Sequence, residues 1–355
     1  MKKSISTALI LSTLSTTFPT VNAGEDYSLT TKGSPLSSGH CTLCDEGHGR
    51  PDAHAPIGVM GDHVHAKGQW MASYRYMNMR MDDLYQGSDT IPNTLAASGF
   101  MMTPTDMQME MHMVGIMYAP TDKLTLMAML NYQEISMNMA NGMGQNAMSM
   151  RTSGVGDTSI GGLYQFFKKE DANAHFGLNL STPTGATDKK LTNGTGADQP
   201  FNMQLGSGSF GLTPSITYNH FLTDTFSYGA QAKYTTYLDE NDEGYTLGDR
   251  FAATTWFAQQ IHRSVSLSTR IQYNVWDGID GTQNNSVNNI MPNISSAADA
   301  SNSGGQSLDA FIGANYLHKS GLRLAVEYGK TLHQDLDGVQ LGYDWQLIAG
   351  AQFAF

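Results

Sequence analysis

Apolar and polar residues alternate with a period of two along most of the chain between residues 68 and 355. The clearest example is the C-terminal stretch, in which every second residue is apolar: Leu341, Tyr343, Trp345, Leu347, Ala349, Ala351, Phe353 and Phe355. Residues 265–275 and 322–331 repeat the pattern. Because successive side chains of a strand point to opposite faces, this period predicts β-strands with one apolar face and one polar face.

These stretches predict a series of strands joined by connections of alternating length. Twelve strands are expected, near residues 68–81, 107–119, 123–137, 156–168, 172–182, 208–221, 225–238, 249–262, 265–276, 306–318, 321–332 and 341–355. Connections such as 120–122 and 263–264 are short, whereas 82–106, 183–207 and 277–305 are long. Outer-membrane barrels have short periplasmic turns and long external loops, and an even strand count leaves both termini in the periplasm. The expected fold class is therefore all-β, a transmembrane antiparallel up-and-down β-barrel in the outer membrane of a Gram-negative bacterium.

The N-terminus has the features of a secretory signal peptide. Lys2 and Lys3 precede a short apolar run at 8–11, and small residues lead up to a cleavage position after Ala23. No apolar run approaches the roughly 18 residues that a membrane-spanning helix needs. We therefore divide the chain into a signal peptide at 1–23, a flexible periplasmic tether or plug at 24–67, and the barrel at 68–355.

Composition and charge agree with a barrel and exclude nucleic acid as a partner. Only 15% of the residues are charged, and the chain has 37 Gly and 16 Tyr. The net charge is −12, and the chain lacks the clusters of Lys and Arg that neutralise phosphates in nucleic-acid-binding proteins. The terminal Phe355, which follows Phe353 on the same face, resembles the C-terminal aromatic signature that the barrel-assembly machinery recognises. The expected partners are outer-membrane lipid, that machinery during biogenesis, and a transported small solute or metal ion.

Methionine is concentrated in the first strands. Of 22 methionines, 19 lie between residues 60 and 150. Residues such as Val114, Ile116 and Leu130 have the parity of the lipid face, and the methionines of these strands have the opposite parity. We therefore expect the following methionines to line the lumen and its mouth: Met71, Met77, Met79, Met81, Met107, Met109, Met111, Met113, Met117, Met127, Met129, Met137 and Met139. Six charged residues are also expected on inner faces: Arg75, Arg270, Asp309, Arg323, Glu327 and Asp344.

Three interpretations of this methionine-rich wall remain open. Thioethers are soft ligands that select Cu(I), so the wall is a candidate path for copper. A flexible and polarizable surface also suits the passage of apolar or aromatic molecules, because sulfur makes favourable contacts with aromatic rings. The third interpretation is that methionine only fills irregular apolar space.

Cysteine and histidine cluster just before the barrel. Both cysteines and five of the eleven histidines lie between residues 40 and 65. Imidazole and thiolate are ligand types for copper and zinc, whereas a disulfide between Cys41 and Cys44 is the alternative in the oxidising periplasm. The candidate metal ligands are His40, Cys41, Cys44, His48, His54, His63 and His65.

Several short motifs resemble the family of outer-membrane transporters named for the meta-pathway of phenol degradation. The first is HAPIGVMGDH at 54–63, and it is followed by WMASYRYM at 70–77. Later motifs are STPTG at 181–185, LGSGSF at 205–210 and RLAVEYG at 323–329. The resemblance extends from the first motif to the end of the chain and implies an outer-membrane channel. It supplies no ligand residues.

Catalytic chemistry finds little support in the chain. The barrel histidines are scattered, no serine lies in a G-x-S-x-G motif, and no phosphate-binding loop is present. We therefore expect no catalytic residue, and an outer-membrane lipid-modifying enzyme is the least favoured reading. The favoured prediction is a porin-like channel that handles copper or another soft metal, with copper or zinc as the only candidate cofactors. The alternative is an uptake channel for small apolar or aromatic compounds.

Overall fold

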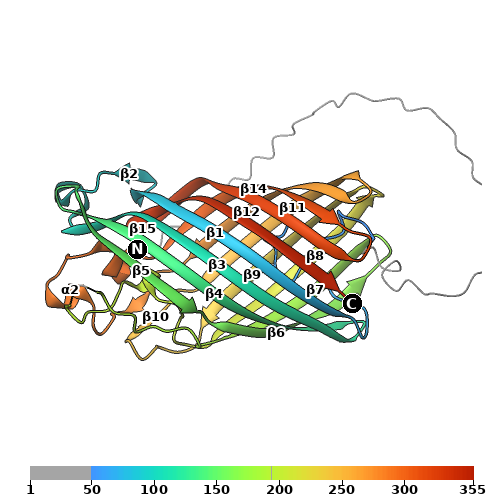
Figure 1. The fold of residues 1–355 in the computed structure, drawn as a ribbon, viewed down its shortest axis with the longest axis horizontal. Coiled ribbons are helices and arrows are strands. Elements are labelled where there is room, and N and C mark those ends of the chain that lie inside the picture. Colours follow the sequence, from blue (N-terminus) through green and yellow to red (C-terminus); the bar gives the residue numbers. More distant parts are fainter. Residues whose placement is uncertain (1–48, 193) are drawn as a thin grey trace, which may run out of the picture. The chain divides into compact units, whose positions relative to one another are not determined.

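Strands with two different faces need a sheet that separates two environments, and the chain forms this sheet as a closed antiparallel ring (Figure 1). The computed structural model describes residues 49–192 and 194–355. Eleven labelled strands of the described part form the ring, each hydrogen-bonded to the next along the chain. They are β1 (Trp70–Gly87), β3 (Met102–Thr121), β4 (Leu124–Asn141), β6 (Thr158–Lys168), β7 (Ala172–Thr182), β8 (Gly211–Thr223), β9 (Phe226–Tyr237), β11 (Arg250–His262), β12 (Val265–Trp276), β14 (Gly305–Leu317) and β15 (Leu322–Ala354).

The long strand β15 contributes two passes to the wall because it folds back on itself. Its residues 323–336 pair with β14, and its residues 336–354 pair with β1. Gly338 has a φ of 70°, the left-handed conformation that a tight hairpin turn requires and that glycine adopts without strain. With both halves of β15 counted, the eleven labelled strands make twelve passes, which confirms the barrel predicted from the sequence. The pairing of β15 with β1 closes the ring.

The remaining elements lie in the longer connections, at the end of the barrel opposite the C-terminus (Figure 1). They are β2 (Asp89–Ile91), β5 (Asn146–Val155), β10 (Tyr245–Thr246), β13 (Asp280–Gly281), α1 (Leu95–Ser98), α2 (Val287–Ile290) and the 3₁₀ helices η1 (Phe201–Met203), η2 (Ser296–Ala298) and η3 (Ala300–Asn302). Within the described residues, no helix has the length and apolar character needed to cross a membrane.

The strands β1 and β3 are longer than the sequence predicted. The expected loop at 82–106 is wrong at both ends, because β1 continues to Gly87 and β3 begins at Met102. These strands have 18 and 20 residues, whereas a membrane-spanning strand needs only about 9–11. The alternation of apolar and polar residues reflects contact with lipid. It therefore does not mark the residues of a strand that continue beyond the bilayer.

A β-bulge corrects the expected orientation of the last pass. Arg80 pairs with Trp345, but Met81 pairs with Tyr343, so Asp344 is an extra residue in the ladder. Beyond this bulge the parity is reversed, and Tyr343 packs inside the barrel against Trp276 instead of facing lipid. Leu341, also expected on the outer face, is only 7% exposed. Asp344, expected on the inner face, instead forms an ion pair at 3.5 Å with the exposed Lys330.

Residues 50–66 lie inside the barrel, and we call them the inner segment. Their backbone has no ladder of its own, so wall side chains supply hydrogen bonds from around the ring. The donors to its carbonyl groups are Ser266 to Pro51 (2.8 Å), Ser227 to Asp52 (2.5 Å), Arg323 to Ala55, Gln231 to Met60 (3.0 Å), His175 to Gly61 (2.8 Å) and Asn219 to Asp62 (2.9 Å). The inner segment is therefore held by strands β7, β8, β9, β12 and β15 together.

A buried ion pair anchors the middle of the inner segment. Arg270 Nε and Nη2 donate to the two carboxylate oxygens of Glu327 at 2.7 and 3.0 Å, and both side chains are 1% exposed. The backbone N–H of Gly58 donates to the same carboxylate at 3.0 Å. A Cβ atom at position 58 would lie 2.3 Å from Glu327 Oε2 and 2.6 Å from Arg270 Nη2. Only glycine therefore allows the inner segment to approach this pair so closely.

Replacing Glu327 with Gln should lower the free energy of unfolding by about 3–5 kcal/mol, because Arg270 would remain buried without its counter-charge. Urea titration of the protein folded in lipid vesicles measures this loss. The double variant Arg270→Gln/Glu327→Gln should recover part of it, since both charges are removed. As a control, Arg151→Gln removes the ion pair with Glu134, whose side chains are 73% and 37% exposed, and should cost less than about 1 kcal/mol. Equal losses for Glu327→Gln and Arg151→Gln would contradict the anchoring role.

Candidate functional site

Two regions of the lumen hold the residues singled out by the sequence: the inner segment and a chamber between it and the longer connections. The inner segment buries apolar side chains against the wall as well as making hydrogen bonds. Ala55 and Val59 pack on Trp256, and Ile57 packs on Ala325 and Ile348. Ile57 is 1% exposed. The inner segment therefore fills this half of the lumen.

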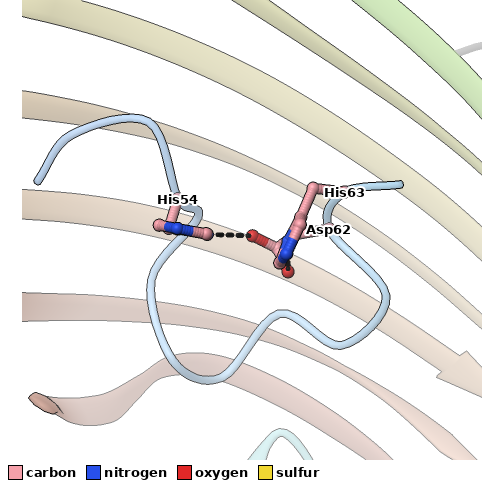
Figure 2. Close-up of side chains that lie close together, drawn as sticks. All are labelled: His54, Asp62 and His63. Carbon is pink, nitrogen blue, oxygen red and sulfur yellow. Dashed lines mark hydrogen bonds and ion pairs between the residues drawn. The ribbon is translucent and has the colours of Figure 1, made fainter. Parts of the chain in front are cut away.

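Two histidines and an aspartate meet across the neck of a loop in the inner segment (Figure 2). His54 stands where the loop begins, and Asp62 and His63 stand where it ends. The Nδ1 atom of His63 lies 2.9 Å from Asp62 Oδ1, and that of His54 lies 3.7 Å from Asp62 Oδ2. The rings of His54 and His63 lie edge to face with centroids 4.6 Å apart. His65 continues the series, with its ring centroid 4.6 Å from that of His63.

Burial sets the protonation state of this cluster. The side chains of His54 and His63 are 11% exposed and that of Asp62 is 6% exposed. Burial lowers the pKa of His54 to about 3, although its hydrogen bond to Asp62 acts in the opposite direction. Burial would raise the pKa of Asp62, but the charge of His63 and hydrogen bonds from both histidines outweigh it and hold that pKa well below its usual range. The cluster thus combines a neutral imidazole with a carboxylate.

The structure places only part of the predicted metal-ligand set. His40, Cys41, Cys44 and His48 lie outside the described residues. His54, His63 and His65 lie together in the inner segment, as described above. Sequence reasoning did not select Asp62 as a ligand, although its place directly before His63 in the D-H-V-H run was an available signal.

The thirteen selected methionines lie on the inner side of β1, β3 and β4, opposite the exposed Val114, Ile116, Leu126 and Leu130. Strand register aligns several of them directly across the sheet: Met71 with Met117, Met77 with Met111, Met79 with Met109, Met81 with Met107, Met107 with Met137, and Met117 with Met127. Met107, Met137 and Met139 are each 1% exposed and belong to one hydrophobic cluster with Leu341. Met71, Met117 and Met127 belong to a second cluster with Leu163. Met113 is 8% exposed, and Met129 borders a small cavity beside the inner segment.

The chamber consists of two cavities of about 500 and 320 Å³ that share Met79, Arg250, Trp276 and Tyr343. One wall is apolar and contains methionines from β1 and β3: Met79, Met81, Met107, Met109 and Met111. The other wall comes from β9, β11, β12 and β14 and contains the polar residues Lys233, Arg250, Gln272, Asn274 and Asp309. The chamber is therefore amphipathic.

The chamber is bordered by both cations and carboxylates: Lys233, Arg250 and Lys330 on the one hand, and Asp157, Asp277 and Asp309 on the other. Asp309 accepts hydrogen bonds from Thr331, Ser307 and Asn274 at 2.7–3.0 Å, so its carboxylate is fully engaged. Lys233 and Arg250 form no ion pair within residues 49–192 and 194–355. Neither cation was predicted as a site residue from the sequence. The inward parity of Lys233, two residues after the buried Gln231, was the signal that could have revealed it.

Comparison with known proteins places this architecture among outer-membrane channels. The fold resembles that of the "COG4313 outer membrane channel from Pseudomonas putida F1", with a TM-score of 0.61 and 14% identity over 84% of this chain and 99% of that one. It also matches the NanC porin, with a TM-score of 0.42 and 9% identity over 79% and 98% of the two chains. A third match is the P. putida toluene transporter TodX, with a TM-score of 0.41 and 11% identity over 82% and 90%.

A search among curated protein sequences found no match. The family described as "Putative MetA-pathway of phenol degradation" matches residues 93–335, more than half of the chain. The barrel has the fold of an outer-membrane channel. The chain therefore belongs to this family, which is described by its link to phenol degradation.

Proposed function

We propose that the protein is an outer-membrane uptake channel for small aromatic compounds, which bind in the chamber while the inner segment closes the rest of the lumen. The observation that carries this proposal is the amphipathic chamber, with a methionine wall facing Lys233 and Arg250. Its cavities of about 500 and 320 Å³ fall in the size range of small-molecule sites.

The packing of the methionines supports an apolar wall better than a copper path. Met107, Met137 and Met139 are buried beside Ile135 and Leu341 in a hydrophobic cluster, where methionine acts as an adaptable apolar side chain. Met79, Met109 and Met111 border the chamber and offer sulfur to an aromatic solute. The ring centroids of Trp276 and Tyr343 lie 5.7 Å apart at the same cavity, and these rings add an aromatic surface against which a solute can stack.

The polar wall favours aromatic compounds that carry an acidic group. Lys233 and Arg250 present positive charge to the chamber, and a phenolate or carboxylate would neutralise it in a partly desolvated space. The family name, which refers to phenol degradation, agrees with this solute class. Passage through the barrel would then require the inner segment to shift, because it occupies the lumen below the chamber.

Replacing Met79, Met109 and Met111 together with Gln should weaken benzoate binding by about tenfold, because a similar volume is kept while apolar contact is lost. Isothermal titration of the detergent-solubilised full chain measures the affinity, and uptake into proteoliposomes measures transport. Met143 is 73% exposed in the connection after β4, so Met143→Gln is the matched control and should bind normally. The proposal fails if the triple variant and the control bind benzoate equally well.

Replacing Lys233 with Met should remove most of the preference for an acidic ring. The ratio of benzoate affinity to benzyl alcohol affinity should fall by about tenfold, equivalent to about 1.4 kcal/mol, while benzyl alcohol binding stays nearly unchanged. Lys123→Met changes an exposed lysine in the turn before β4 and should leave the ratio as it was. An unchanged ratio in Lys233→Met would exclude Lys233 as the group that recognises the acid.

A further inference from the structure

We infer that the inner segment contains a binding site for a divalent transition-metal ion, formed by His54, Asp62 and His63, and that the ion fastens the loop between them. One ligand atom from each of the three residues lies within 4.8 Å of the others, and the three side chains converge on one point (Figure 2). The site is separate from the chamber that we propose for the solute.

The donor set determines the class of ion. Two imidazole nitrogens and one carboxylate oxygen are typical ligands of Zn²⁺, and they also suit Cu²⁺ and Ni²⁺. Thioether sulfur, which selects Cu(I), is not part of the set. Three protein ligands leave a fourth position for water or for His65, whose ring adjoins that of His63. The expected ion is therefore a borderline divalent cation, not the Cu(I) suggested by the methionine content.

The wall fixes both sides of this site before any ion binds. Asp62 is held through its carbonyl oxygen by Asn219 at 2.9 Å, and its carboxylate accepts the N–H of Ala55 at 3.1 Å. Next to His54, the Ala55 carbonyl accepts a hydrogen bond from Arg323. Because the backbone on each side is anchored, only rotation of the side chains is needed to reach bonding distances of about 2.0–2.2 Å.

A buried positive charge beside the site limits the affinity. Arg323 donates to the carbonyl of Ala55, the residue next to His54, and its charge opposes a dication. We therefore expect a dissociation constant on the order of micromolar, weaker than that of a closed structural zinc site.

An ion at this site would join the two ends of the loop that carries Ala55, Ile57, Gly58 and Val59. Three of these side chains pack against the wall, and the Gly58 N–H reaches the Arg270–Glu327 pair. Closing the loop at its neck removes freedom from the detached state of the inner segment, so the docked state gains relative stability. The ion would thereby act as a lock on the inner segment.

The test uses the purified full chain with Cys41→Ser and Cys44→Ser, which removes the thiolates that precede the inner segment. Cobalt(II) serves as a spectroscopic probe for zinc, and we expect one equivalent to give the visible absorption of a low-coordinate nitrogen and oxygen site. His54→Ala and His63→Ala should each weaken binding by about 100-fold or more, since even neighbours of metal ligands often change affinity by 10–100-fold. The control His112→Ala alters a histidine bonded to Tyr74 away from the site and should bind cobalt normally.

A second measurement covers the case in which the histidine variants fail to fold. Electron paramagnetic resonance of Cu²⁺ bound to the Cys41→Ser/Cys44→Ser protein should show coupling to imidazole nitrogen without any further substitution. Zn²⁺ should also raise the melting temperature of this protein but not that of a folded His54→Ala/His63→Ala variant. Absence of nitrogen-coupled copper, or a stabilisation that persists in the double histidine variant, would overturn the inference. Neither readout depends on solute transport.

Discussion

The requirement that every buried backbone group find a hydrogen-bond partner shapes both the wall and the contents of this barrel. In the wall the requirement is met by closure, because the pairing of β1 with β15 leaves the ring without an open edge. In the lumen it is met by side chains, which donate to the carbonyl groups of the inner segment from many strands at once. The polar inner residues of the wall therefore serve as hydrogen-bond partners of one particular chain segment.

The part of the lumen around the inner segment and the part that forms the chamber differ in their chemistry. Around the inner segment the wall supplies serine, asparagine and glutamine side chains that donate to its backbone, together with the buried Arg270–Glu327 pair. Around the chamber it supplies methionines on one side and, on the other, Lys233 and Arg250, which form no ion pair with any residue that the structure describes. A satisfied polar network favours one fixed arrangement, whereas flexible thioethers and unpaired charges can adapt to a ligand. The contrast agrees with our proposal that the inner segment closes the lumen and that the chamber binds the solute.

The sequence predicted the barrel well because lipid contact imposes a local rule on every strand. Parity placed Met107 and Met117 inside and Val114 and Ile116 outside from the sequence alone. It failed at Tyr343, because a single bulged residue reverses the faces and leaves no local trace in the sequence. The predicted ends of β1 and β3 were also wrong, because both strands continue beyond the part that the lipid-facing alternation marks. The pairing of Asp62 with His54 depends on how the loop between them folds against the wall. The placement of Lys233 in the same chamber as Met79 depends on the closure of the ring, which no local pattern encodes.

The position of the inner segment directly before β1 has a consequence for the order of assembly. The seam that closes the barrel joins the first strand to the last, so the ring cannot be complete until the C-terminal residues have been placed. The partners of the inner segment are spread from Thr125 on β4 to Glu327 on β15, and its docking site therefore exists only when the sheet is nearly finished. Such distant contacts form late and slowly during folding. An unfinished barrel would thus hold an undocked leading segment, and seam closure and docking would form one concerted final step of biogenesis.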